Sequence, residues 1–115
     1  MKHLLFVIII LSLSACNRFG DQKPVDLIPQ KNMVDILVDI HVADAVVEHK
    51  FGPTTTNIAM TNALYNRIYQ NYGITAAQYK TSYKYYEAHP DIMDKMYTQV
   101  ITELSKKEAE LSKKK

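Results

Sequence analysis

The apolar positions of the chain fall into four stretches with helical spacing, separated by turn signals. The strongest stretch covers residues 33–50, where apolar residues recur every three or four positions. Its many Val and Ile residues would suit a strand locally, but its length without a turn signal favours a helix. Pro29 suits the first turn of this helix, and Gly52 followed by Pro53 is a typical stop. The inward face expected for it comprises Met33, Ile36, Leu37, Ile40, Ala43 and Val47, widened by Val34, Val38, Val42, Ala45 and Val46.

Three further helices follow from the local signals. Residues 54–57 offer N-caps for a second helix that closes at Gly73. Thr75 and Gln78 form a capping box at the start of a third helix, and Pro90 begins a fourth. The inward faces expected are Ile58, Thr61, Leu64, Tyr65, Ile68 and Tyr72 in the second helix, Tyr79, Tyr83 and Tyr86 in the third, and Met93, Tyr97, Val100 and Leu104 in the fourth. We therefore predict an all-α fold, a small bundle of about four helices over residues 29–105, with a Lys-rich helical tail at 106–115 that frays.

The N-terminus has the layout of a secretory signal. Lys2 precedes an apolar run at residues 4–13, which is too short to span a bilayer comfortably, and small residues lead to Cys16. The run Leu13-Ser14-Ala15-Cys16 resembles the lipobox of bacterial lipoproteins, in which the cysteine is lipidated and the signal is cut before it. The resemblance implies that residues 1–15 are removed, and that residues 16–28 form the lipidated Cys16 and a tether. A diacylglyceryl group carries two chains, enough for stable membrane anchoring.

The residues after Cys16 bear on the location of the protein. Asn17 stands where enterobacterial lipoproteins retained at the inner membrane usually carry Asp. Residues 17–23 contain one acidic residue, Asp21, whereas some Bacteroidota lipoproteins carry a run of acidic residues there as a surface-export signal. We therefore expect an anchor in the outer membrane, with the protein facing the periplasm.

Composition excludes several classes of protein. The 115 residues allow one domain, and an apolar share of 47% excludes a generally disordered chain. The formal charge of +2 gives no electrostatic reason to expect a nucleic acid as a partner. Cys16 is the only cysteine, so no intrachain disulfide can form.

A metal site is the main chemical candidate in the first helix. His41, Asp44 and Glu48 are spaced i, i+3, i+7 and would lie on one side of it. They could bind zinc or iron if another helix closed the site; otherwise they form a polar stripe beside the core. Since the chain has no Glu-x-x-His or His-x-x-x-His pair, we expect no metal and no cofactor. Hydrolase signatures are also absent from the sequence, so we expect no enzyme.

Eight tyrosines are a high number for this length. They either fill a thin core and its edge or line a groove for a peptide or a partner helix. Tyr79, Tyr83 and Tyr86 share one helical face, and Tyr85 points about 100° away from Tyr86. Tyr85, together with Tyr69 on the outer side of the second helix, is therefore our candidate for contact with a partner.

An ordered set of motifs resembles a known family. The motifs are Leu27-Ile28-Pro29, the run from Met33 to Ala45, Tyr72-Gly73-Ile74-Thr75 and Tyr85-Tyr86 with His89-Pro90. Behind a lipobox, they resemble small Bacteroidota lipoproteins that share the domain of unknown function 4296, over roughly residues 25–104. The resemblance implies an envelope location and a helical fold, but no catalytic residue.

The function expected is that of a non-catalytic, membrane-anchored accessory or adaptor subunit of an envelope complex, with a protein partner. One alternative is a chaperone-like binder of unfolded outer-membrane proteins or peptides. A second alternative is a small metal-dependent enzyme that uses His41, Asp44 and Glu48.

Overall fold

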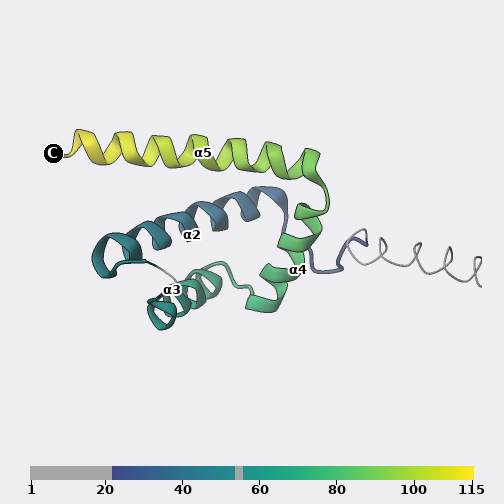
Figure 1. The fold of residues 1–115 in the computed structure, drawn as a ribbon. Helices are drawn as coiled ribbons and strands as arrows, with labels where there is room; N and C mark the ends of the chain where they lie inside the picture. The colour runs from purple at the N-terminus through teal and green to yellow at the C-terminus, as the bar shows by residue number, and fades with distance from the viewer. Residues whose placement is uncertain (1–21, 54–55) are drawn as a thin grey trace, which may run out of the picture.

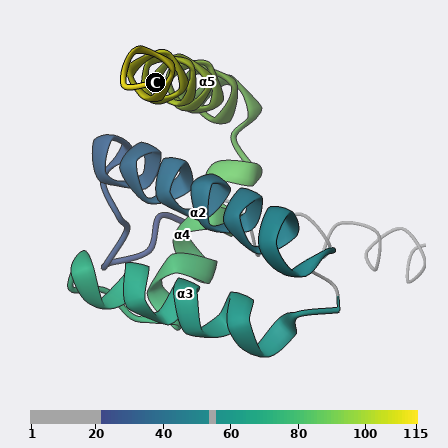
Figure 2. The same cartoon turned by 90° about the vertical axis from the view of Figure 1, so that its left-hand side faces the viewer.

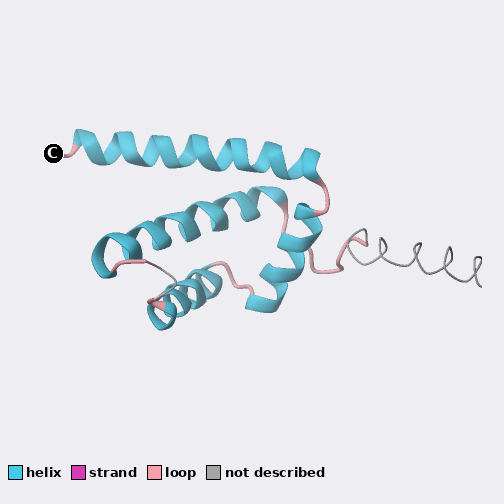
Figure 3. Ribbon diagram, viewed as in Figure 1, coloured by secondary structure: helices cyan, strands magenta, loops and turns pink. Residues whose placement is uncertain are grey.

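Four helices make up the fold in the computed structural model, which describes residues 22–53 and 56–115. They are α2 (Gln30–Phe51), α3 (Ile58–Asn71), α4 (Ala76–Glu87) and α5 (Pro90–Lys113). Within these described ranges there is no strand, as Figure 3 shows. The all-α fold and the four-helix bundle that we predicted are therefore confirmed.

The central helix of the bundle is α2. It lies between α3 on one side and α5 on the other, and α4 crosses one end to connect α3 to α5 (Figures 1 and 2). Both α2 and α5 begin at the end where α4 lies, so these two helices run in the same direction, whereas α3 runs back along α2 (Figure 1). The bundle is thus closed by α4 at one end and open at the other.

The core gathers around the N-terminal two thirds of α2, as its periodicity predicted. Met33 and Ile36 are 0% exposed, and Leu37 is 2% exposed. The other helices supply fewer buried side chains, namely Ile68, Tyr69, Ser82, Tyr86, Met96 and Val100. Apolar burial at about 25 cal/mol per Å² is the main driving force for such packing, and α2 supplies more buried side chains than any other helix.

Two parts of the expected inward faces are wrong. Val42 and Val46 are 40% and 42% exposed and Ala45 is exposed as well, although Val47 next to Val46 is buried. Ile58, expected to face inward from the second helix, is 62% exposed at the first residue of α3. These positions have the spacing of a buried face, but no neighbouring helix covers them at the open end of the bundle.

Helices α2 and α3 end next to the glycines that the sequence predicted as their stops. Gly52 and Gly73 have φ values of 84° and 66°, in the left-handed region that favours glycine. After α3, the Ile74 N–H donates to the Tyr69 carbonyl and the Gly73 N–H donates to the Gln70 carbonyl, which is the hydrogen-bond pattern of a Schellman motif. Pro29 differs by one position from the expectation, because it is the N-cap of α2 and not part of the first turn.

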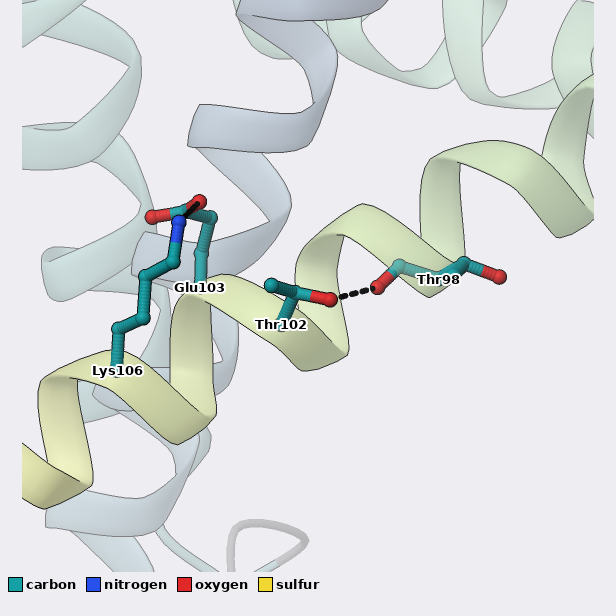
Figure 4. A network of polar contacts seen from close by, with 4 residues as sticks. All are labelled: Thr98, Thr102, Glu103 and Lys106. Carbon is teal, nitrogen blue, oxygen red and sulfur yellow. Dashed lines mark hydrogen bonds and ion pairs between the residues drawn. The ribbon is translucent and has the colours of Figure 1, made fainter.

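The C-terminal part of α5 is helical up to Lys113, and residues 105–115 are exposed. On its polar side the Thr102 hydroxyl donates to the Thr98 carbonyl at 2.9 Å, and Lys106 pairs with Glu103 at 2.8 Å, as seen in Figure 4. Such local contacts stabilise an exposed helix only slightly. Across the described part of the chain, no helix is both long and apolar enough to cross a membrane.

Candidate functional site

Five tyrosines form a continuous cluster across three helices, and we call them the tyrosine cluster: Tyr65 and Tyr69 of α3, Tyr79 and Tyr83 of α4, and Tyr97 of α5. Successive ring centroids are 6.4 Å, 5.2 Å and 6.0 Å apart from Tyr65 to Tyr83. Tyr97 lies close to Tyr83, because burial and then the neighbouring Tyr83 hydroxyl raise the pKa of Tyr97. Aromatic contacts of this kind stabilise the packing of neighbouring helices, so the cluster joins α3, α4 and α5, which surround α2.

Two carboxylates of α2 accept hydrogen bonds from tyrosine hydroxyls, one within α3 and one at its C-cap. Tyr65 donates to Asp44 at 2.7 Å, and Tyr72 donates to Asp39 at 2.8 Å. Burial of the hydroxyl, the hydrogen bond and the negative charge of the carboxylate all favour the neutral phenol, in that order of size. The pKa values of Tyr65 and Tyr72 are therefore raised well above the ordinary value of 10.0. Burial likewise raises the pKa of Tyr79, and it raises that of Tyr97 to about 12.

These raised pKa values predict a loss of stability in alkali. Because the tyrosines hold their protons more tightly when folded, the stabilisation is complete below pH 10 and falls as the pH rises towards the pKa values of the folded protein. We expect the free energy of unfolding in urea to decrease steadily above pH 10. Tyrosinate absorbance should rise together with the loss of helical circular dichroism, and the Tyr65→Phe/Tyr72→Phe variant should show a weaker pH dependence. Ionisation of all eight tyrosines near pH 10 with the helices intact would contradict the assignment.

The three metal candidates on α2 do not converge. Asp44 faces α3, where it accepts from Tyr65, whereas the His41 ring lies 6.2 Å from that of Tyr97 on α5. Glu48 is exposed. Among the described residues there is no group of three His, Cys, Asp or Glu side chains that could hold a metal ion. The i, i+3, i+7 spacing covers only about 60° of the helix, but α3 and α5 flank this arc, so Asp44 and His41 reach different neighbours. Our expectation that no metal binds stays a prediction.

The two partner-contact candidates differ in their surroundings. Tyr69 is 7% exposed and belongs to the core, so its assignment to the outer side of the second helix is wrong. The cause is the position of α4, which places Tyr79 against the Tyr69 ring. Tyr85 is half-buried, with its ring 5.5 Å from Tyr86 and 4.2 Å from His89. Contact of Tyr85 with a partner stays a prediction.

Side chains of α4 form hydrogen bonds with the main chain at the end of the tether, a contact that we did not predict. The Ile28 N–H donates to the buried Ser82 hydroxyl at 3.0 Å, and the Tyr86 hydroxyl donates to the Ile28 carbonyl at 2.5 Å. Gln78 donates from its side chain to the Asp26 carbonyl at 2.9 Å. The three side chains of α4 are spaced i, i+4, i+8, and a small polar Ser on an aromatic face was the signal available in the sequence.

The hydrogen bonds between α4 and the tether also correct the predicted capping box. The Thr75 side chain does accept from the Gln78 N–H at 3.0 Å, as a cap should. The Gln78 side chain does not return to the cap, because it bonds to Asp26. At the buried Ile28, Ser82 and Tyr86 pair both main-chain groups, as buried polar groups require.

A third feature is an open apolar groove between α2 and α5, which we call the α2–α5 groove. It is a hollow of about 460 Å³. Its lining residues are His41, Val42, Ala45, Val46, His49 and Lys50 of α2, and Leu104, Lys107, Glu108 and Leu111 of α5. Apolar side chains dominate the lining, and Leu111 is 66% exposed. Exposed apolar residues gathered in one hollow are typical of an interaction site, whereas scattered ones are not.

Comparison with known proteins identifies the family of the chain. Searches of curated proteins and of solved structures each returned no match. The model of one family, described as a domain of unknown function, matches residues 24–110 and so includes all four helices up to the last turn of α5. The matched part also includes the tether segment held by α4 and the α2–α5 groove, except for Leu111. The chain therefore belongs to the family of the domain of unknown function 4296.

Proposed function

We propose that the protein is a non-catalytic, lipid-anchored adaptor, held in the outer membrane through Cys16 and binding a protein partner of an envelope complex on the periplasmic side. The observation that carries this proposal is the open α2–α5 groove. An adaptor needs a surface that its own fold leaves uncovered, and partner helices commonly bind in such grooves.

The attachment of the tether supports the same proposal. Residues 17–23 separate Cys16 from Pro24, whose carbonyl accepts a main-chain hydrogen bond from Leu27. Seven residues span at most about 25 Å when extended. Since the tether is held against α4, the lipid would lie at the α4 end of the bundle, and the groove lies at the other end (Figure 1). A lipid-anchored protein would thus present the groove away from its anchor.

The hydrogen-bonded carboxylates on the α3 side of α2 support a non-catalytic role. Asp39 and Asp44 already accept tyrosine hydroxyls, and these carboxylates hold the neutral forms of Tyr72 and Tyr65. A general base at neutral pH needs a group that can release and take up a proton there. The raised pKa values of Tyr65 and Tyr72 move these hydroxyls further from that range.

The test is replacement of Cys16 by Ser together with native purification. We expect Cys16→Ser to abolish lipid labelling, leave unprocessed precursor and remove the protein from the outer-membrane fraction. The wild-type protein, tagged after Lys115 and purified from its own membranes, should retain one stoichiometric partner.

Three results would contradict the proposal. Lipid labelling that persists in Cys16→Ser would refute the anchor. Many sub-stoichiometric outer-membrane proteins in place of one partner would favour the chaperone-like alternative. A full equivalent of metal that is lost in His41→Ala would favour the enzyme.

A further inference from the structure

The two helices that line the α2–α5 groove present matching apolar stripes. Val42, Ala45 and Val46 lie at i, i+3, i+4 on α2, and Leu104 and Leu111 lie seven residues apart on α5. The two helices run in the same direction, and residues 41–50 of α2 lie beside residues 104–111 of α5. Two neighbouring helices with apolar residues at this spacing form the seam into which a further helix inserts its own apolar residues.

A second hollow between α2 and α5, nearer the N-terminus of α2, differs in chemistry. It is lined mainly by polar side chains, including Lys31, Asp35, Thr102 and Glu103. Several of these groups already pair with one another or with their own helix, for example Lys31 with Asp35 at 3.5 Å (Figure 4 shows the pairs on α5). That hollow is therefore suited to water, and the apolar seam belongs to the α2–α5 groove.

The rim of the groove is basic. Lys50 and Lys107 lie on opposite helices of the lining, together with His41 and His49, and Glu108 is its one acid. Charge complementarity steers association and discourages partners of the same sign. An occupant with acidic flanks would pair with the two lysines. A second copy of this chain would bring a second basic rim to the same seam, which disfavours self-association.

We infer that the α2–α5 groove binds an amphipathic helix of a partner protein, with its apolar stripe on Val42, Val46, Leu104 and Leu111 and acidic residues flanking that stripe toward Lys50 and Lys107. This inference rests on the proposed adaptor role and specifies the class of partner segment. The groove is concave, so its apolar floor fits the convex surface of a helix better than the flat surface of a bilayer.

The experiment uses the full lipidated chain in phosphatidylcholine nanodiscs. The probe is a fluorescent 18-residue helical peptide with Leu at i, i+3, i+4, i+7 and Glu on both flanks, and the matched probe has Lys in place of each Glu. Anisotropy is corrected for binding to empty nanodiscs. We expect the Glu-flanked peptide to bind at least tenfold more tightly than the Lys-flanked one, because the rim lysines attract only the first.

Two variants locate the binding. Val46→Asp, in the floor of the groove, should weaken binding of the Glu-flanked peptide at least tenfold. Its matched control is Ile101→Asp, an exposed position on α5 outside the groove that is 62% exposed, and it should leave binding unchanged. The variant Lys50→Glu/Lys107→Glu should reverse the preference in favour of the Lys-flanked peptide. Both of these lysines are exposed, so this variant tests the inference even if Val46→Asp lowers helicity.

Several results would overturn the inference. Equal binding of both peptides, or no binding above that of empty nanodiscs, would refute the acidic helix as the occupant. Dimers that become monomers in Val46→Asp would assign the groove to a second copy. A Val46→Cys thiol protected from an aqueous reagent in nanodiscs without peptide would assign the groove to the membrane.

Two outcomes separate the groove inference from the adaptor role. If the native partner co-purifies undiminished with the Lys50→Glu/Lys107→Glu variant, the groove inference fails and the adaptor role stands. If no native partner exists but the Glu-flanked peptide binds as expected, the adaptor role fails and the groove inference stands.

Discussion

Replacement of Leu37 by Ala will lower the free energy of unfolding by about 2–5 kcal/mol. Leu37 is 2% exposed at the centre of α2, among the core residues contributed by the other helices. Its truncation removes apolar contacts and leaves a cavity that the packed helices can fill only in part. Since the total stability of a domain is about 5–15 kcal/mol, the melting temperature should fall sharply. Urea unfolding followed by circular dichroism measures the change.

The matched control is Val42→Ala, five positions along the same helix. Val42 is 40% exposed in the α2–α5 groove. Surface substitutions of this kind change stability by about 0.5 kcal/mol or less. Equal losses in Leu37→Ala and Val42→Ala would mean that the core does not lie on the face of α2 that the structure assigns to it.

Replacement of Tyr86 by Ala is expected to have the largest effect in α4, about 3–5 kcal/mol for truncation of a buried aromatic ring. Tyr86 is 2% exposed, more buried than Tyr79 and Tyr83 on the same helix. Its ring packs in the core and its hydroxyl binds the Ile28 carbonyl. The variant should therefore loosen the tether segment as well as α4, and hydrogen exchange at Leu27 and Ile28 should rise.

The conservative variant Tyr86→Phe separates the two roles. It keeps the ring but leaves the buried Ile28 carbonyl without its donor, at a cost of about 1–3 kcal/mol. Tyr85→Phe is the matched control, because the Tyr85 hydroxyl has no hydrogen bond among those found in the described structure. If Tyr86→Phe and Tyr85→Phe were equally stable, the hydroxyl of Tyr86 would not hold the tether.

Helix boundaries could be predicted because they depend on residues close in sequence. Gly73 ends α3 since its positive φ costs glycine little, and Thr75 caps α4 through an N–H three residues away. Pro90 lies in the first turn of α5 as expected. The inner face of α2 was predicted correctly at Ile36, Leu37 and Ile40, since periodicity alone orients a helix toward its core.

The contacts of particular side chains could not be predicted in the same way. The Gln78 side chain had a local partner available at its own cap, but the tether brings the Asp26 carbonyl within 2.9 Å. Tyr69 was expected on the outer side of its helix, yet Tyr79 of α4 covers it. In both cases the deciding neighbour belongs to another part of the chain.

The sequence by itself determined the helical fold, the order and ends of the helices, the family and the core face of α2, since each depends on local spacing or on an ordered set of motifs. Only the tertiary structure decided which apolar faces are covered. Val47 is buried and Val46 beside it is 42% exposed, although both have apolar side chains at helical spacing. The difference arises because α3 and α5 flank α2 and leave one apolar seam open between α2 and α5. Burial depends on the neighbour that packs against a face, and the hydrophobic pattern of one helix does not specify that neighbour.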